Sequence, residues 1–97
     1  MAEVSIHADA EAEYEAALAW YWARSAKAAQ GFEAAFERAL ELIAANPDLY
    51  PRCDDRHRFC VLRRYPYSLI YRVDENQVRV VAVAHSRRLP GYWSNRA

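Results

Sequence analysis

The Asn46-Pro47 pair divides this chain into a stretch with helical periodicity and a stretch with strand periodicity, and this division constrains the fold more than any other feature. Proline cannot continue a helix and restricts the residue before it, so a helix that reaches Asn46 ends there. Before the pair, apolar residues recur at steps of three and four, which is typical of a buried helix face. These residues are Phe32, Phe36, Leu40 and Ile43.

Another helix is predicted earlier in the chain, from about Asp9 to Ser25, because apolar residues again recur at helical steps. These residues are Ala10, Tyr14, Ala17, Leu18 and Tyr21. Trp20 and Trp22 fall beside this stripe, and we expect both side chains to be partly exposed. The break near Ser25 is short, so the two helices should form an antiparallel hairpin. Core packing explains both stripes better than a cofactor site does.

Strand patterns flank this helical region. The predicted strands are residues 3–7, 59–63, 67–73 and 77–84, with a turn at 74–76. The last of them is apolar on both faces, which suits a central strand covered by helices on one side and partly covered on the other. The order of elements predicts a single α+β domain over residues 1–97. It consists of an N-terminal strand, an antiparallel helical hairpin and a three-stranded, mostly antiparallel sheet with the hairpin across one face.

Ninety-seven residues suffice for one domain with a modest core, and a hydrophobic fraction of 54% is enough to fold it. The first residues lack the basic and apolar regions of a signal peptide, and no apolar stretch approaches the length of a membrane span. We therefore expect a cytoplasmic protein without a membrane partner. Cys53 and Cys60 are too few for a disulfide framework and lack partners at zinc-ligand spacing. We expect two free thiols, with Cys60 the better core candidate, and neither a metal site nor a cofactor.

Charge is distributed unevenly along the chain, although the formal net charge is zero. Residues 1–51 hold three Lys or Arg and nine Asp or Glu, whereas residues 52–97 hold ten Arg and four Asp or Glu. Arginine suits planar contacts with carboxylate or phosphate better than lysine does. Two interpretations are open: the basic half pairs with the acidic helices of its own chain, or it forms a basic binding face.

Several motifs along nearly the whole chain are similar to those of one known family. One of them is the C-terminal run AVAHSRRLPGYWSNR, which resembles the end of ParE-type toxins. The matching positions in that run are His85, Arg88, Pro90, Tyr92 and Trp93. Further matches are the pair Trp20-Tyr21, the run LRRYPY at residues 62–67 and the pair Ile70-Tyr71. The chain thus resembles the ParE/RelE superfamily of toxins from type II toxin-antitoxin systems, and it is closer to the ParE branch.

This resemblance implies a small growth-inhibiting toxin of the plasmid-stabilisation type. A co-expressed antitoxin would neutralise it by forming a toxin-antitoxin hetero-oligomer. Two activities occur in the superfamily: ParE-type toxins bind DNA gyrase, whereas RelE-type toxins cut messenger RNA on the ribosome. A third alternative is a decayed toxin kept as an antitoxin-binding module. The fold alone does not separate these alternatives, because function depends on the site.

Metal-independent RNA cleavage requires a proton acceptor, a proton donor and cations near the phosphate. Under the nuclease alternative His85, Arg88 and Tyr92 are the candidates for these roles, although His85 also suits a strand-end imidazole bonded to a neighbour. The resemblance places basic residues of the RelE pattern at positions that Ser68 and Ser86 occupy here. We therefore predict a toxin that binds gyrase and has no catalytic residues.

Residues that contact the target or the antitoxin are predicted among the aromatic and arginine side chains. They are Trp20, Trp22, Arg63, Arg64, Arg87, Arg88 and Trp93. Arg63 and Arg64 also suit a solvated strand end, and Tyr92 and Trp93 also suit anchors that hold the C-terminal segment in the core.

Overall fold

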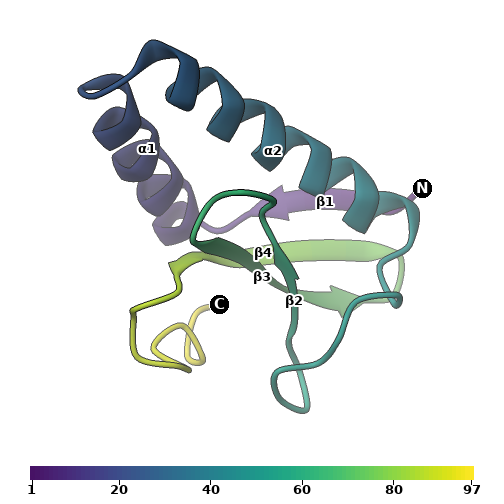
Figure 1. The fold of residues 1–97 in the computed structure, drawn as a ribbon. Coiled ribbons are helices and arrows are strands. Elements are labelled where there is room, and N and C mark those ends of the chain that lie inside the picture. The colour runs from purple at the N-terminus through teal and green to yellow at the C-terminus, as the bar shows by residue number, and fades with distance from the viewer.

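The computed structural model describes all 97 residues and shows two helices packed over one face of a sheet (Figure 1). In chain order the elements are β1 (Glu3–Ile6), α1 (Ala8–Trp22), α2 (Ala26–Ala45), β2 (Arg58–Val61), β3 (Tyr67–Asp74) and β4 (Gln77–His85). The α+β class and the type of every element agree with the prediction from periodicity. The differences are shifts of up to three residues at element ends.

The boundary between the helices is set by a capping side chain. The Ser25 hydroxyl accepts a hydrogen bond from the Ala28 amide at 3.1 Å, so Ser25 begins α2. This explains why α1 stops at Trp22, three residues before its predicted end. At its other end, α2 stops at Ala45 with Asn46 as its C-cap, directly before the proline as predicted.

The sheet has the strand order β1-β4-β3-β2. β1 pairs with β4 in parallel, and the other neighbours are antiparallel. The three strands that follow the helices were predicted to form one sheet. The predicted N-terminal strand, β1, joins them as a fourth strand, because the helical hairpin brings the chain back beside it. β1 pairs only with residues 77–80 of β4, so the second half of β4 has an edge that β1 does not cover.

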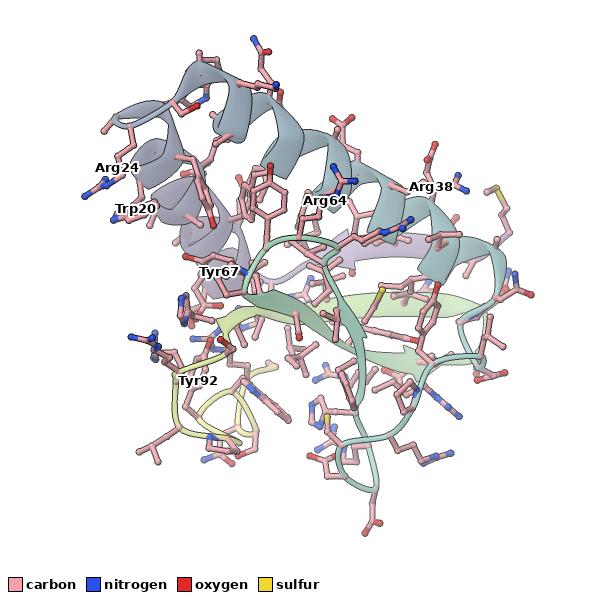
Figure 2. The ribbon with its side chains drawn as sticks, in the orientation of Figure 1. Trp20, Arg24, Arg38, Arg64, Tyr67 and Tyr92 are labelled. Carbon is pink, nitrogen blue, oxygen red and sulfur yellow. The ribbon has the colours of Figure 1, made fainter.

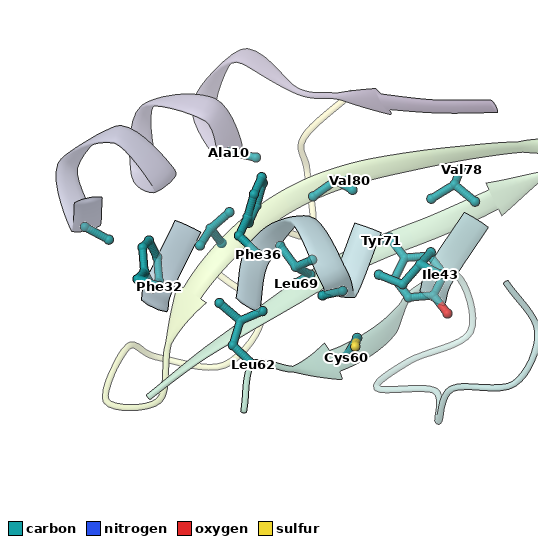
Figure 3. Close-up of a cluster of buried hydrophobic side chains, with 13 residues drawn as sticks. Ala10, Phe32, Phe36, Ile43, Cys60, Leu62, Leu69, Tyr71, Val78 and Val80 are labelled. Atoms are coloured by element: carbon teal, nitrogen blue, oxygen red, sulfur yellow. The ribbon is translucent and has the colours of Figure 1, made fainter. Parts of the chain in front are cut away.

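The main core lies between the helices and one face of the sheet (Figure 3). Phe32, Phe36 and Ile43 of α2 are almost fully buried there, and Leu69 of β3 belongs to the same cluster. Tyr14 of α1 stacks on Phe36 with ring centroids 4.0 Å apart. Both predicted apolar stripes thus contribute to this core.

The opposite face of the sheet is covered in part by the C-terminal segment. Trp93 of that segment packs against Val81 and Ala82 of β4 and Ile70 of β3. β4 is therefore buried on both faces, as its apolar sequence predicted. The His57 ring, from the loop before β2, meets the Trp93 ring at a centroid distance of 4.8 Å.

Both cysteines are free thiols, as predicted. Cys60 belongs to the main core, whereas Cys53 is exposed. No group of three or more His, Cys, Asp or Glu side chains is arranged to hold a metal ion. Neither helix combines the length and the apolar character that crossing a membrane requires.

Candidate functional site

A groove of about 420 Å³ lies between α1 and the end of the sheet where β3 begins and β4 ends. α1 contributes Glu13, Ala16, Ala17, Trp20 and Tyr21 to its lining. The sheet end and the segments beside it contribute Pro66, Tyr67, Val83, His85 and Arg88. Trp20, His85 and Arg88 were predicted as site residues from separate parts of the sequence, and the fold brings them together here. Most of the lining is apolar, with one carboxylate and one guanidinium group.

The α1 wall of this groove offers one large aromatic surface. The Trp20 side chain is 51% exposed and meets the Tyr21 ring edge-on at 5.1 Å. The Arg24 guanidinium lies 3.8 Å from the centre of the Trp20 ring, and both side chains project from the outer side of α1 (Figure 2). Ala16 and Ala17 are small and leave the groove open beside the indole. Trp20 is thus held by its neighbours while half of its surface is available to a partner.

His85 forms part of the opposite wall, at the last position of β4. It pairs with Tyr67 across the sheet, and the two rings meet edge-on at 5.0 Å. The Arg87 amide donates a hydrogen bond to Nδ1 of His85 at 3.0 Å. Nδ1 therefore carries no proton, and in the neutral ring Nε2 bears it, so Nε2 is a donor rather than a proton acceptor. This is the strand-end imidazole that was one of the two interpretations from sequence.

Glu13 connects α1 with β4 and with the C-terminal segment. Its carboxylate accepts hydrogen bonds from the Val83 amide at 3.0 Å, the Tyr92 hydroxyl at 2.7 Å and the Arg96 guanidinium at 2.9 and 3.1 Å. Burial by itself would raise the pKa of Glu13, but these donors outweigh burial and the pKa is lowered. The carboxylate is therefore held in its charged form, and each of its two oxygens accepts two hydrogen bonds.

Tyr92 lies in the C-terminal segment (Figure 2), where it is held between two charged groups. Its hydroxyl donates to Glu13, and the Arg88 guanidinium lies 4.0 Å from the centre of its ring. Burial, together with the neighbouring Glu13 carboxylate, raises the pKa of Tyr92 to about 12. The arrangement is that of an anchor for the C-terminal segment, since the hydroxyl proton is already committed to a carboxylate.

Other predicted contact residues lie outside this groove. Arg63 and Arg64 are in the β2–β3 loop and line a separate hollow beside Gly31 of α2. Arg64 has a φ of 71°, in the left-handed region, which turns the loop back toward β3. Trp22 is 48% exposed, as expected, but it lines neither hollow.

Trp93 was predicted as a contact residue, and the structure corrects this. Its side chain is 6% exposed because the indole fills the second face of the sheet. Trp93 therefore offers almost no surface to a partner. Its position matches the alternative from sequence, an anchor that holds the C-terminal segment in the core.

Three of the ten arginines in the second half form ion pairs with carboxylates: Arg58 with Asp48 at 3.8 Å, Arg72 with Asp74 at 3.5 Å and Arg96 with Glu13 at 2.9 Å. In contrast, no carboxylate lies within 4.0 Å of the four arginines that were predicted as contact residues. Among the three paired arginines, Arg96 is the one that pairs with an acidic helix, through Glu13 and Asp9 of α1, so the pairing interpretation holds for that residue. The basic binding face stays a prediction.

Sequence analysis missed the pairing of Glu13 with Arg96. The two residues are 83 positions apart, and no spacing rule connects them. A signal was available in the helical stripe, because Glu13 follows Ala10 by three residues and precedes Ala17 by four. A carboxylate on a buried helix face needs a partner, but the sequence does not say which one.

The architecture described above is that of a small α+β domain with the ParE fold. It is similar to a solved structure described as "Chromosomal ParDE TA system from P. aeruginosa", with a TM-score of 0.73 and 19% sequence identity. That alignment covers 88% of this chain and 96% of the other chain. No curated protein matches the chain. A family model described as "ParE toxin of type II toxin-antitoxin system, parDE" matches residues 4–90, and the chain therefore belongs to the ParE toxin family.

Proposed function

We propose that this ParE-family toxin inhibits DNA gyrase by binding it and does not cleave a nucleic acid. The observation that carries the proposal is the state of the two groups that a nuclease would use for proton transfer. Nδ1 of His85 is occupied by the Arg87 amide, and the Tyr92 hydroxyl is occupied by Glu13. Proton transfer requires a free acceptor and a free donor that reach the substrate. The bond to Nδ1 leaves His85 with Nε2 as a donor and without a free acceptor nitrogen, and the Tyr92 proton is already donated to Glu13.

The small number of positively charged side chains in the groove also favours binding over cleavage. Ser68 lies within β3, opposite Ala84, and the Ser86 amide donates to the Pro66 carbonyl at 2.8 Å. Neither serine supplies the positive charge that the RelE pattern has at these positions. Losing one electrostatic contact to a transition state typically costs about 10²–10³ in rate. Arg88, the one arginine that lines the groove, does not compensate for two such losses.

The gyrase proposal is tested with the purified chain in two parallel assays. We expect it to inhibit DNA supercoiling or to trap cleaved DNA, while primer extension on programmed ribosomes finds the message intact. His85→Ala should weaken the inhibition by about threefold at most, because the ring contributes contact rather than proton transfer. Discrete cuts in the ribosomal A site that disappear in His85→Ala or Tyr92→Phe would instead assign the chain to the ribosome-dependent nucleases. Antitoxin binding without either activity would indicate a decayed toxin.

We also propose that the antitoxin covers the groove beside α1 and uses Trp20 as its anchor. Disordered segments of partner proteins commonly fold on binding, and a half-exposed indole gives such a segment a large apolar contact. Trp20→Ala should weaken antitoxin binding by about 30-fold in calorimetry, a loss typical of an aromatic hot spot. Trp22→Ala is the matched control, since Trp22 is equally exposed but lies outside the groove. Equal losses in the two variants would contradict this placement.

A further inference from the structure

A second apolar groove lies between α2 and the edge strand β2, on the other side of the β2–β3 loop from Trp20 (Figure 2). Its volume is about 540 Å³. A hollow of about 320 Å³ continues it, because Ala35 and Arg63 line both spaces. We call the two spaces together the α2–β2 groove.

The α2–β2 groove has a mostly apolar lining. Leu42 on the α2 side is 37% exposed, and Val61 borders the groove at the edge of the sheet. Between them the lining includes Ala39, Tyr50 and Leu62. Apolar side chains that gather around a hollow, rather than lying singly on the surface, mark an interaction site.

The backbone of β2 is open at the same place. The Phe59 amide points away from β3 and donates to the Pro51 carbonyl at 3.1 Å, so the outer edge is covered at that residue. Val61 follows two residues later and therefore presents its amide and carbonyl to the same outer side. No backbone hydrogen bond outside the helices and strands uses either group, and the carbonyl accepts only a long contact from the Cys60 thiol at 4.0 Å. An open edge of this kind accepts an extended segment as an added strand.

The charge around the groove has one sign. Arg38, Arg63 and Arg64 contribute to the lining, and no lining residue is acidic. Glu41 is the one carboxylate paired with any of these arginines, at 3.8 Å from Arg38, and both of those side chains are exposed. Exposed pairs of this kind are weak. The complement of this surface is an acidic segment.

The α2 wall also gives the length of a segment that would fill the groove. Gly31 and Leu42 lie at the two ends of the groove and are eleven residues apart. A helix rises 1.5 Å per residue, so this wall is about 16 Å long, the span of about five residues in a strand.

We propose that the α2–β2 groove binds an acidic, apolar segment of a partner protein in extended conformation. The segment pairs with the backbone of Val61 as a fifth strand. Alternate side chains pack against Leu42 and Tyr50, and its carboxylates meet Arg38 and Arg63. This inference does not depend on gyrase or on the groove beside α1.

The binding experiment uses the full ¹⁵N-labelled chain and the capped peptide Asp-Val-Glu-Val-Asp-Leu, with a matched peptide in which lysine replaces each acidic residue. We expect saturable shift changes centred on the amides of Val61 and Leu42 with the acidic peptide, and no saturation with the lysine peptide. No binding of the acidic peptide at about 5 mM, equal binding of the two peptides, or shifts centred on Trp20 would each overturn the proposal.

Variants separate a specific groove from general electrostatic attraction. Arg38→Glu combined with Arg63→Glu should weaken binding at least tenfold, whereas Arg24→Glu combined with Arg56→Glu changes the net charge equally outside the groove and should have little effect. Val61→Pro removes the outward amide without removing a ladder bond, and it should also weaken binding while the circular dichroism spectrum is unchanged. Equal losses in the two double variants would overturn the assignment, as would concentration-dependent dimerisation that Val61→Pro abolishes.

Discussion

Replacing Glu13 by alanine should destabilise the domain by about 3 kcal/mol, because one carboxylate accepts hydrogen bonds from three residues in β4 and the C-terminal segment. The substitution leaves the Val83 amide and the Tyr92 hydroxyl without an acceptor. It also removes the hydrogen-bonded carboxylate of the Arg96 guanidinium, which keeps the Val81 carbonyl. A buried donor left unpaired costs about 1–3 kcal/mol. The side chains of Glu13 and Arg96 are 16% and 18% exposed, so water reaches the site in part. We therefore take the low end, about 1 kcal/mol for each of the three donors.

Urea unfolding followed by circular dichroism measures this loss. Glu15→Ala is the matched control, because Glu15 is exposed on the same helix and should change the stability by less than about 0.5 kcal/mol. For a domain of this size 1 kcal/mol corresponds to about 4–8 °C in Tm, so Glu13→Ala should melt roughly 12–24 °C below the parent. If Glu13→Ala and Glu15→Ala unfold at the same urea concentration, the reasoning is refuted.

The same network predicts the pH dependence of this difference. The pKa of Glu13 in the folded chain lies below its ordinary value of 4.5, so the folded state takes up this proton less readily than the unfolded state does. The contribution to stability is then complete above pH 4.5 and is lost as the pH falls through the lowered pKa. The difference in unfolding free energy between the parent and Glu13→Ala should be constant near neutral pH and should become smaller in acid.

Two further predictions concern α2. Phe36→Ala removes an almost fully buried ring that stacks on Tyr14 and should cost roughly 3–5 kcal/mol; an unchanged thermal melt would show that Phe36 is not in the core. A Cβ at Gly31 would clash with the Tyr65 hydroxyl group, which donates a hydrogen bond to the Ala28 carbonyl at 2.9 Å. Gly31→Ala should therefore stabilise the domain by the full helix-propensity gain of about 1 kcal/mol only when Tyr65 is also replaced by Phe. A double-mutant cycle measures this dependence, and an equal gain from Gly31→Ala with Tyr65 and with Phe at position 65 would contradict the contact.

The identity and order of the elements could be predicted from the sequence, because local interactions determine them. The stripe from Phe32 to Ile43 indicates a helix whatever covers it, and Asn46-Pro47 ends that helix through its own backbone restrictions. The exposure of Trp20 and Trp22 also followed from their places beside a stripe. The family resemblance rested on motifs spread along most of the chain, and the family match over residues 4–90 confirms it.

Only the tertiary structure decided which of these residues share a surface. Trp20 and His85 line one groove because α1 packs beside the uncovered end of β4, whereas Arg63 and Arg64 lie across the β2–β3 loop in another hollow. Trp93 is buried because the C-terminal segment folds back over the second face of the sheet. Contacts between residues so far apart depend on strand order and on how helices pack over a sheet. Periodicity records which face of an element is apolar, but it does not record which other element covers that face.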